Sequence, residues 1–319
     1  MEEIVSGFGL IEAPVWDPAK GLYFSDVRNG GVYLLDHGGQ VSQIIPKRRG
    51  VGGMALHASG GLVIGGRNIA WVSPDGSETR ILLSPEAIPE AIGFNDLTTD
   101  RLGRIYVGSL AYRVFVDPAK PGHLHVIDLD GSMRTLSDGV MLTNGLGFSP
   151  DELKLYHSDS RSDMVRIYDV AKDGSVSPPR KFATLGPAKV ADGLKVAEDG
   201  SVWVADARGG RVAVFEPHGM PKADIPVPMP MVTSLCFGGE DMRDLYIVTG
   251  SDDGPGKIAG PSTRCGPRWR DCRFIRRGSP CLPPKALHWS ARRWNARPHR
   301  RSPFSARPRR RGGRAPSGR

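Results

Sequence analysis

The sequence predicts an all-β fold, a six-bladed β-propeller, and three observations support this prediction. Runs of alternating β-branched or aromatic residues recur every 40 to 50 residues, beginning at Leu22, Leu62, Ile105, Leu155, Val202 and Leu245. Repeats of this length are typical of four-stranded propeller blades. Asp-Gly pairs suited to tight hairpins follow several of the repeats. No long stretch shows the period of an amphipathic helix.

Each repeat is expected to contain two central strands joined by a short turn. A second alternating run follows the first in most repeats, at residues 31–36, 69–73, 123–128, 165–169 and 211–215. The sixth repeat has an alternating run at 244–249 but no second run after it. We therefore expect the sixth blade to be incomplete, with an exposed edge.

A further short run precedes each alternating strand and is expected to form the innermost strand of the blade. These runs begin ten to twelve residues earlier, at Glu12, Gly52, Asn95, Asn144, Asp192 and Thr233. Equivalent positions of successive blades lie at one mouth of the central channel, so their side chains should converge. Four of the six are Glu, Asn, Asn and Asp, whose carboxylate and amide oxygens suit a hard divalent cation such as Ca²⁺, Mg²⁺ or Mn²⁺.

Four motifs carry a resemblance to a known family. They are Glu12-Ala-Pro-Val-Trp16, Asn144-Gly-Leu-Gly-Phe-Ser-Pro-Asp151, Leu155-Tyr-His-Ser-Asp-Ser160 and Asp192-Gly-Leu194. The chain from about Ile11 to Thr249 resembles the senescence-marker protein/gluconolactonase/luciferin-regenerating-enzyme family, with every motif in register. The resemblance implies a six-bladed propeller with one divalent metal in its channel. It places the metal ligands on Glu12, Asn144 and Asp192, and a substrate- or water-binding residue on Asn95.

The function implied is that of a divalent-metal-dependent hydrolase that opens a lactone ring, as gluconolactonase does. The metal would bind the carbonyl oxygen as a Lewis acid and stabilise the oxyanion formed when water attacks. By resemblance, Asp192 would also position or deprotonate that water. Ca²⁺ is the preferred cation, with Zn²⁺, Mg²⁺ and Mn²⁺ as alternatives. A non-catalytic, metal-binding or regulatory propeller would share these ligands and stays open as the alternative function.

One position departs from the family pattern. The family often has an arginine two residues before the substrate asparagine, where it contacts substrate hydroxyls, and this chain has Gly93 there. Specificity for sugar lactones is therefore open, whereas lactonase chemistry is unaffected. Tyr112 and Arg113 are expected to line the channel mouth, and Asp96 and Asp100 to stabilise local turns.

Charge divides the chain into two parts. The net charge is +9, but residues 254–319 hold 19 Lys and Arg against one acid, Asp271, so residues 1–253 are acidic. We predict a propeller domain over 1–253 and a disordered Arg- and Pro-rich tail over 254–319, of the composition that a shifted reading frame would give. The tail has no recognisable nucleic-acid-binding motif, so we expect no specific nucleic-acid partner.

The sequence also predicts a cytoplasmic protein without a membrane partner. It has no apolar run of about 18 residues and no basic stretch followed by an apolar segment at its start. Cys236 is the one cysteine of four that precedes residue 254, which is not a disulfide framework. The expected partner is a small-molecule lactone, and the sequence does not specify an oligomeric state.

Overall fold

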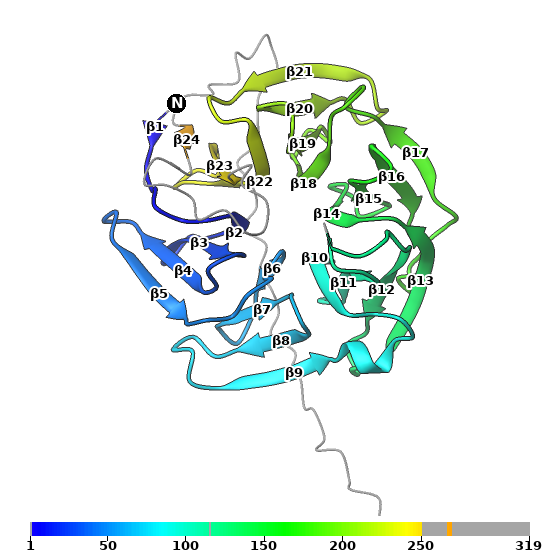
Figure 1. Cartoon of the computed structure of the whole chain (residues 1–319), viewed down its shortest axis with the longest axis horizontal. Coiled ribbons are helices and arrows are strands. Elements are labelled where there is room, and N and C mark those ends of the chain that lie inside the picture. The colour runs from blue at the N-terminus through cyan, green and yellow to red at the C-terminus, as the bar shows by residue number, and fades with distance from the viewer. Residues whose placement is uncertain (1, 115, 251–266, 270–319) are drawn as a thin grey trace, which may run out of the picture.

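The computed structural model describes residues 2–114, 116–250 and 267–269. In this part of the chain the protein is an all-β propeller, with sheets arranged radially about a central axis (Figure 1). The helical content of the same residues is a single 3-10 turn, η1 (Pro85–Ala87). None of the helical structure described is long and apolar enough to cross a membrane.

Five blades are each built from four consecutive antiparallel strands, numbered outward from the axis. The first contains β2 (Ile11–Asp17), β3 (Gly21–Asp26), β4 (Val32–Asp36) and β5 (Val41–Ile45). The second contains β6 (Met54–Leu56), β7 (Leu62–Ile64), β8 (Ile69–Val72) and β9 (Thr79–Leu83). The third contains β10 (Gly93–Thr99), β11 (Ile105–Leu110), β12 (Gly122–Ile127) and β13 (Met133–Val140).

The fourth blade contains β14 (Thr143–Phe148), β15 (Lys154–Asp159), β16 (Met164–Asp169) and β17 (Arg180–Ala183). The fifth contains β18 (Ala191–Val196), β19 (Val202–Asp206), β20 (Arg211–Phe215) and β21 (Pro221–Pro226). The two central strands of these blades coincide with the alternating runs predicted from the sequence. The 40- to 50-residue period therefore located them correctly.

The terminal sheet joins the two ends of the described chain. It consists of β22 (Met231–Gly238), β23 (Asp244–Gly250), β24 (Pro267–Trp269) and β1 (Glu2–Glu3), in the order β22-β23-β24-β1. The prediction that no strand would follow β23 is wrong, because Trp269 and Arg268 pair with Leu245 and Tyr246 of β23. A strand as short as β24 pairs through backbone hydrogen bonds, so its sequence need not alternate between apolar and polar residues. Residues 251–266 and 270–319, and with them the predicted disorder of the tail, lie outside the described residues.

The core lies between the faces of neighbouring blades. Tyr23 and Val32 of the first blade, for example, share a cluster with Ile64 and Val72 of the second. Because both faces of a blade are covered, every residue of β3 and β19 is buried. Apolar packing of this kind fixes the blades against one another and holds the start of each innermost strand at the axis.

The ring closes through its innermost strands. β22 of the terminal sheet lies beside β2 of the first blade (Figure 1). The buried Thr233 hydroxyl donates to the Ile11 carbonyl oxygen at 2.6 Å, one residue before Glu12. The hydrogen bond that closes the ring therefore lies directly beside Glu12, one of the predicted site residues.

Candidate functional site

Five innermost strands have a bulge near their start. The β2–β3 ladder is interrupted between Glu12 and Val15. The β10, β14, β18 and β22 ladders are interrupted between Phe94 and Leu97, Thr143 and Leu146, Ala191 and Leu194, and Val232 and Ser234. A bulge re-aims side chains locally and is common next to active sites. All four predicted site residues lie in these bulges or at their edge.

The structure links the four predicted side chains in two pairs. The Asn95 amide nitrogen donates to Oδ1 of Asn144 at 2.6 Å. The carboxyls of Glu12 and Asp192 are both buried, and their charges repel one another. Because these residues occupy equivalent positions on β2, β10, β14 and β18, they meet at one end of the axis, as the sequence predicts.

A third carboxyl group, missed from the sequence, belongs to the same site. Asp96 follows Asn95 in the bulge of β10, is buried, and raises the pKa of both Glu12 and Asp192 by charge repulsion. The prediction that Asp96 stabilises a local turn is therefore wrong. Its neighbour in that prediction, Asp100, does accept the turn N–H groups of Leu102 and Arg104. The sequence places Asp96 directly after Asn95, and this is the feature that could have identified it. That neighbourhood indicates a site residue only once the bulge between Phe94 and Leu97 is known.

The electrostatics of the three carboxyl groups favour a cation. Burial, then Asp192 and Asp96, raise the pKa of Glu12 well above its usual range, against smaller opposing effects of the Ala13 N–H and Lys195. Burial and then Asp96 likewise raise the pKa of Asp192. Burial raises the pKa of Asp96 to about 7, with Lys195 acting against it. Three carboxyl groups that repel one another are stabilised in their charged form by a divalent cation.

The predicted ligands Glu12, Asn144 and Asp192 fit a hard cation, provided that the amide oxygen of Asn144 is one of the ligand atoms. Among the described residues, no cluster of three or more histidine, cysteine, aspartate or glutamate side chains is arranged to hold a metal. The predicted set of Glu12, Asn144 and Asp192 therefore depends on an amide oxygen beside two carboxylates. Carboxylate and amide oxygens are the ligands that Ca²⁺ takes in proteins.

Hydrogen bonds fix the orientation of the Asn144 amide. Its nitrogen donates to the Ser160 hydroxyl at 2.7 Å, and that hydroxyl donates to the Ala191 carbonyl oxygen at 2.5 Å. Oδ1 of Asn144 is consequently the atom directed toward Asn95. Ser160 thus joins the fourth blade to the residue that precedes Asp192.

Asn95 presents an acceptor to the site. Its amide nitrogen donates both to the Thr143 carbonyl oxygen at 2.8 Å and to Asn144, which uses both amide hydrogens. The remaining atom, Oδ1, lies beside Gly52, where an added Cβ would come within 1.8 Å of it. Gly52 occupies the ring position of the second blade, and the absence of a side chain there makes room for the Asn95 amide.

Tyr112 and Arg113, the two residues predicted at the mouth, follow β11, whose last residue Leu110 pairs with Gly93 at the start of β10. Tyr112 is buried, and the exposed Arg113 forms a two-pronged ion pair with Asp117 at 2.7 and 2.9 Å. Close packing surrounds Gly93, because an added Cβ would lie 3.1 Å from the Gly66 carbonyl oxygen. Gly66 in turn exchanges backbone hydrogen bonds with Phe94, so a larger residue at 93 would press on a paired segment.

A family model described as SMP-30/Gluconolactonase/LRE-like region matches residues 10–251. The chain belongs to this family. The resemblance seen in the sequence motifs is thereby confirmed, and the matched residues include all of β2 to β23.

Similar proteins and similar solved structures cover most of the propeller. The chain is 30% identical over 252 residues to a pentonolactonase of Haloferax volcanii (77% of this chain, 83% of the relative). It is 31% identical over 249 residues to a 6-deoxy-6-sulfogluconolactonase of Pseudomonas putida (76% and 84%). A gluconolactonase structure from Xanthomonas campestris is 25% identical, with a TM-score of 0.69 over 78% of this chain and 86% of that one. A luciferin-regenerating enzyme, 24% identical, shares the fold with a TM-score of 0.73 over 84% and 94%.

Proposed function

We propose that this protein is a divalent-metal-dependent lactonase acting on a small-molecule lactone. The observation that carries the proposal is the meeting of Glu12, Asn95, Asn144 and Asp192 at one end of the innermost strands. Two relatives at least 30% identical are named as lactonases of sugar-derived substrates, which supports the reaction type. We further propose that the terminal sheet serves as the sixth blade of the propeller.

In this proposal Glu12, Asn144 and Asp192 hold the cation, with Ca²⁺ preferred over Mg²⁺, Mn²⁺ or Zn²⁺ on the basis of the oxygen donors. A bound cation supplies Lewis-acid polarisation of the lactone carbonyl and stabilises developing negative charge on its oxygen. Asp96 adds negative charge beside the ligands. It thereby strengthens the attraction for a cation without being assigned as a ligand.

In this proposal Asp192 accepts a proton from the attacking water, and Asn95 orients the substrate or that water. Water attacks the carbonyl carbon while Asp192 accepts the water proton; the ring C–O bond then breaks and the proton passes to the departing oxygen. A carboxyl group whose pKa is raised by burial is better suited to accept a proton at neutral pH than an ordinary surface aspartate. Oδ1 of Asn95 would accept a hydrogen bond from a substrate hydroxyl or from the attacking water.

Hydrolysis of a lactone panel in the presence and absence of a chelator tests the proposal. We expect ring opening that is lost with EDTA and restored by CaCl₂ or another divalent salt. Cation binding by calorimetry without hydrolysis of any lactone would instead support the non-catalytic, metal-binding alternative. Hydrolysis that is unaffected by EDTA would overturn the metal dependence.

A further inference from the structure

We propose that Asp26, Asp159 and Asp206 are positioning residues for the cation site. Each lies at the end of the second strand of a blade and holds the backbone segment that leads directly into Glu12, Asn144 or Asp192. This inference rests on the proposed function, because it concerns how the proposed ligands are held. All three carboxyl groups are almost fully buried, at 1%, 0% and 0% exposure.

In the first blade, Asp26 holds the segment before Glu12. Its carboxylate accepts the N–H of Gly9 at 2.9 Å and of Leu10 at 3.4 Å. The same group accepts the N–H groups of Arg28 and Asn29, at 3.1 and 2.9 Å, in the loop that follows β3. One carboxylate therefore joins two loops on the side of the blade where Glu12 lies.

The fourth blade repeats this arrangement. Asp159 accepts the N–H groups of Met141 and Leu142, both at 3.1 Å, immediately before Thr143 and Asn144. The Ser162 hydroxyl at 3.0 Å and the Arg166 guanidinium at 2.7 Å hold the carboxylate from the other side.

The fifth blade repeats it again. Asp206 accepts the N–H of Val190, two residues before Asp192, at 3.2 Å. The Arg208 N–H at 3.2 Å and the Arg211 guanidinium at 3.1 Å complete its contacts.

A backbone hydrogen bond accompanies each of these carboxylates. The residue after the aspartate donates its N–H to the carbonyl oxygen two residues before the ligand: Val27 to Leu10, Ser160 to Leu142 and Ala207 to Val190, at 2.9, 3.0 and 3.0 Å. The single residue left between anchor and ligand is the one paired with the aspartate across the ladder, namely Ile11, Thr143 or Ala191. A displacement of the anchored segment would therefore reach the ligand with no flexible residue between them.

Among the described blades, aspartate occurs at this position only in the three that carry a proposed metal ligand. In the third blade and the terminal sheet, Ser109 and Thr249 hold the equivalent ladder positions, opposite Phe94 and Val232. In the second blade, β7 ends at Ile64 and is followed by Gly65, whose N–H donates to the Gly53 carbonyl oxygen at 2.9 Å. None of these three blades carries a proposed metal ligand. A charged acceptor binds backbone N–H groups more strongly than a hydroxyl does, and the three ligand-bearing blades are the ones that have it.

Calcium binding to the full chain, measured by titration calorimetry with CaCl₂, tests the inference. Asparagine keeps the shape of aspartate but turns one acceptor into a donor, so the backbone N–H groups lose a partner. We expect Asp26→Asn, Asp159→Asn and Asp206→Asn each to weaken calcium binding about 10–100-fold, as loss of outer contacts does at metal sites. The stabilisation of the protein by calcium, read as a shift in Tm, should fall in parallel.

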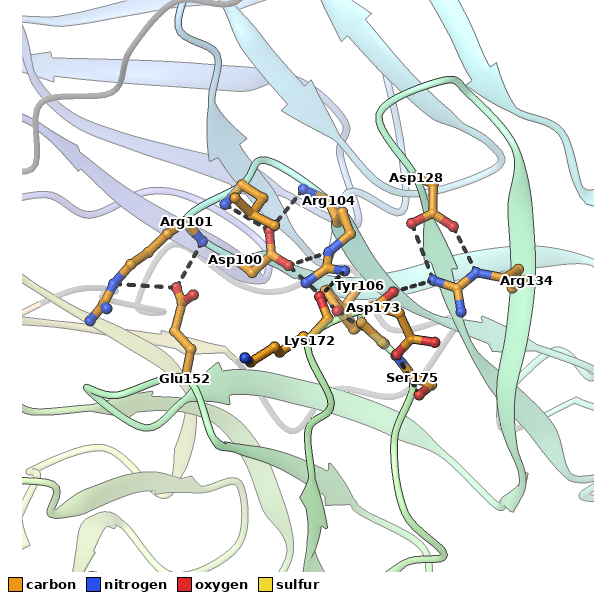
Figure 2. A network of polar contacts seen from close by, with 12 residues as sticks. Asp100, Arg101, Arg104, Tyr106, Asp128, Arg134, Glu152, Lys172, Asp173 and Ser175 are labelled. Carbon is orange, nitrogen blue, oxygen red and sulfur yellow. Dashed lines mark hydrogen bonds and ion pairs between the residues drawn. The ribbon is translucent and has the colours of Figure 1, made fainter.

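Asp100→Asn is the matched control. Asp100 is also buried, accepts two turn N–H groups and pairs with the Arg104 guanidinium at 2.5 Å (Figure 2). It directly follows β10, at the end of that strand opposite Asn95. We expect Asp100→Asn to lower the Tm without changing the dissociation constant for calcium. If Asp159→Asn does not fold, Ser162→Ala removes one contact to the same carboxylate and should still weaken calcium binding.

The outcomes separate the two proposals. Suppose that the unmodified protein binds calcium and that the three aspartate variants bind it equally tightly, although their Tm is lowered as in Asp100→Asn. That result would overturn the positioning role and leave the proposed function standing. If the unmodified protein binds neither CaCl₂ nor MgCl₂, MnCl₂ or ZnCl₂, the proposed cation site and the positioning role both fail.

Discussion

The two ends of the innermost strands use acidic residues in opposite ways. At the site end, burial and then repulsion from Asp192 and Asp96 raise the pKa of Glu12, and burial and then repulsion from Asp96 raise the pKa of Asp192. At the other end, acids are paired with arginines that join the third blade to the fourth (Figure 2).

The far network shows what a structural arrangement of charges looks like in this protein. Arg104 pairs with Asp100 and donates to the Lys172 carbonyl oxygen of the fourth blade at 3.2 Å. Arg134 pairs with Asp128 and reaches the Asp173 carbonyl oxygen at 2.8 Å. Asp100 and Asp128 each have an arginine partner, and a nearby opposite charge stabilises the charged form of a carboxyl group. Among the described residues, Glu12, Asp96 and Asp192 have no such arginine partner, and the proposed cation would compensate their charge.

The largest expected effect comes from removing one charge at the site end. Asp192→Asn should lower kcat/KM by about 10³-fold, because a proposed ligand and proton acceptor is lost. In EDTA the same variant should melt at an equal or higher temperature, since repulsion of Glu12 is relieved. Lactone hydrolysis kinetics check the first part, thermal melts check the second, and titration calorimetry measures the calcium affinity. Unchanged calcium affinity in Asp192→Asn and in Glu12→Gln would show that these side chains are not ligands.

At the far end the sign of the stability change should be reversed. Arg104→Met leaves Asp100 buried without its cation and should lower the free energy of unfolding by roughly 3 kcal/mol. At about 2–4 °C per kcal/mol, the Tm should fall by roughly 6–12 °C. Calcium affinity should be unaffected. A Tm equal to that of the unmodified protein would mean that the network adds little stability.

The pH dependence of stability should also distinguish the two ends. Burial raises the pKa of Asp96 to about 7, and the pKa values of Glu12 and Asp192 are also raised, so the folded protein holds protons that the unfolded chain releases. Their contribution to stability is present below about pH 4 and is lost as the pH rises toward and through 7. In the absence of divalent cations, the Tm of the protein should therefore fall as the pH is raised from 5 to 8. The increase in Tm on adding CaCl₂ should be largest at pH 8. Asp96→Asn should flatten this profile, and an unchanged slope would contradict the coupling.

The smallest effect concerns substrate choice. Because Gly93 offers no side chain to substrate hydroxyls, small or aliphatic lactones should be hydrolysed with a kcat/KM up to about tenfold above that for aldonolactones. A panel of lactones matched in ring size measures this ratio. Equal or faster hydrolysis of aldonolactones would show that another side chain supplies those contacts.

The repeat period and its phase were enough to predict the two central strands of five blades and the equivalent positions of Glu12, Asn95, Asn144 and Asp192 on the innermost strands. Asp96 could not be predicted in the same way, because strict alternation would turn it away from the side that Asn95 faces. The bulge between Phe94 and Leu97 breaks that alternation, and it has no clear mark in the sequence. β24 was missed for a different reason, since its pairing with β23 uses backbone hydrogen bonds and does not require an alternating apolar sequence. The link from Asp159 to Asn144 needs the antiparallel register, which the sequence alone does not supply.

The Thr233–Ile11 hydrogen bond joins two residues 222 positions apart. Contacts within a blade are local and can form early, whereas closing a loop of this length carries a large entropy cost and is expected late in folding. Glu12 comes from the first blade and Asp192 from the fifth, so their approach depends on the same closure. The cation binding that we propose would therefore require the closed ring. In a refolding experiment it should be gained last, after the β-sheet signal is already complete.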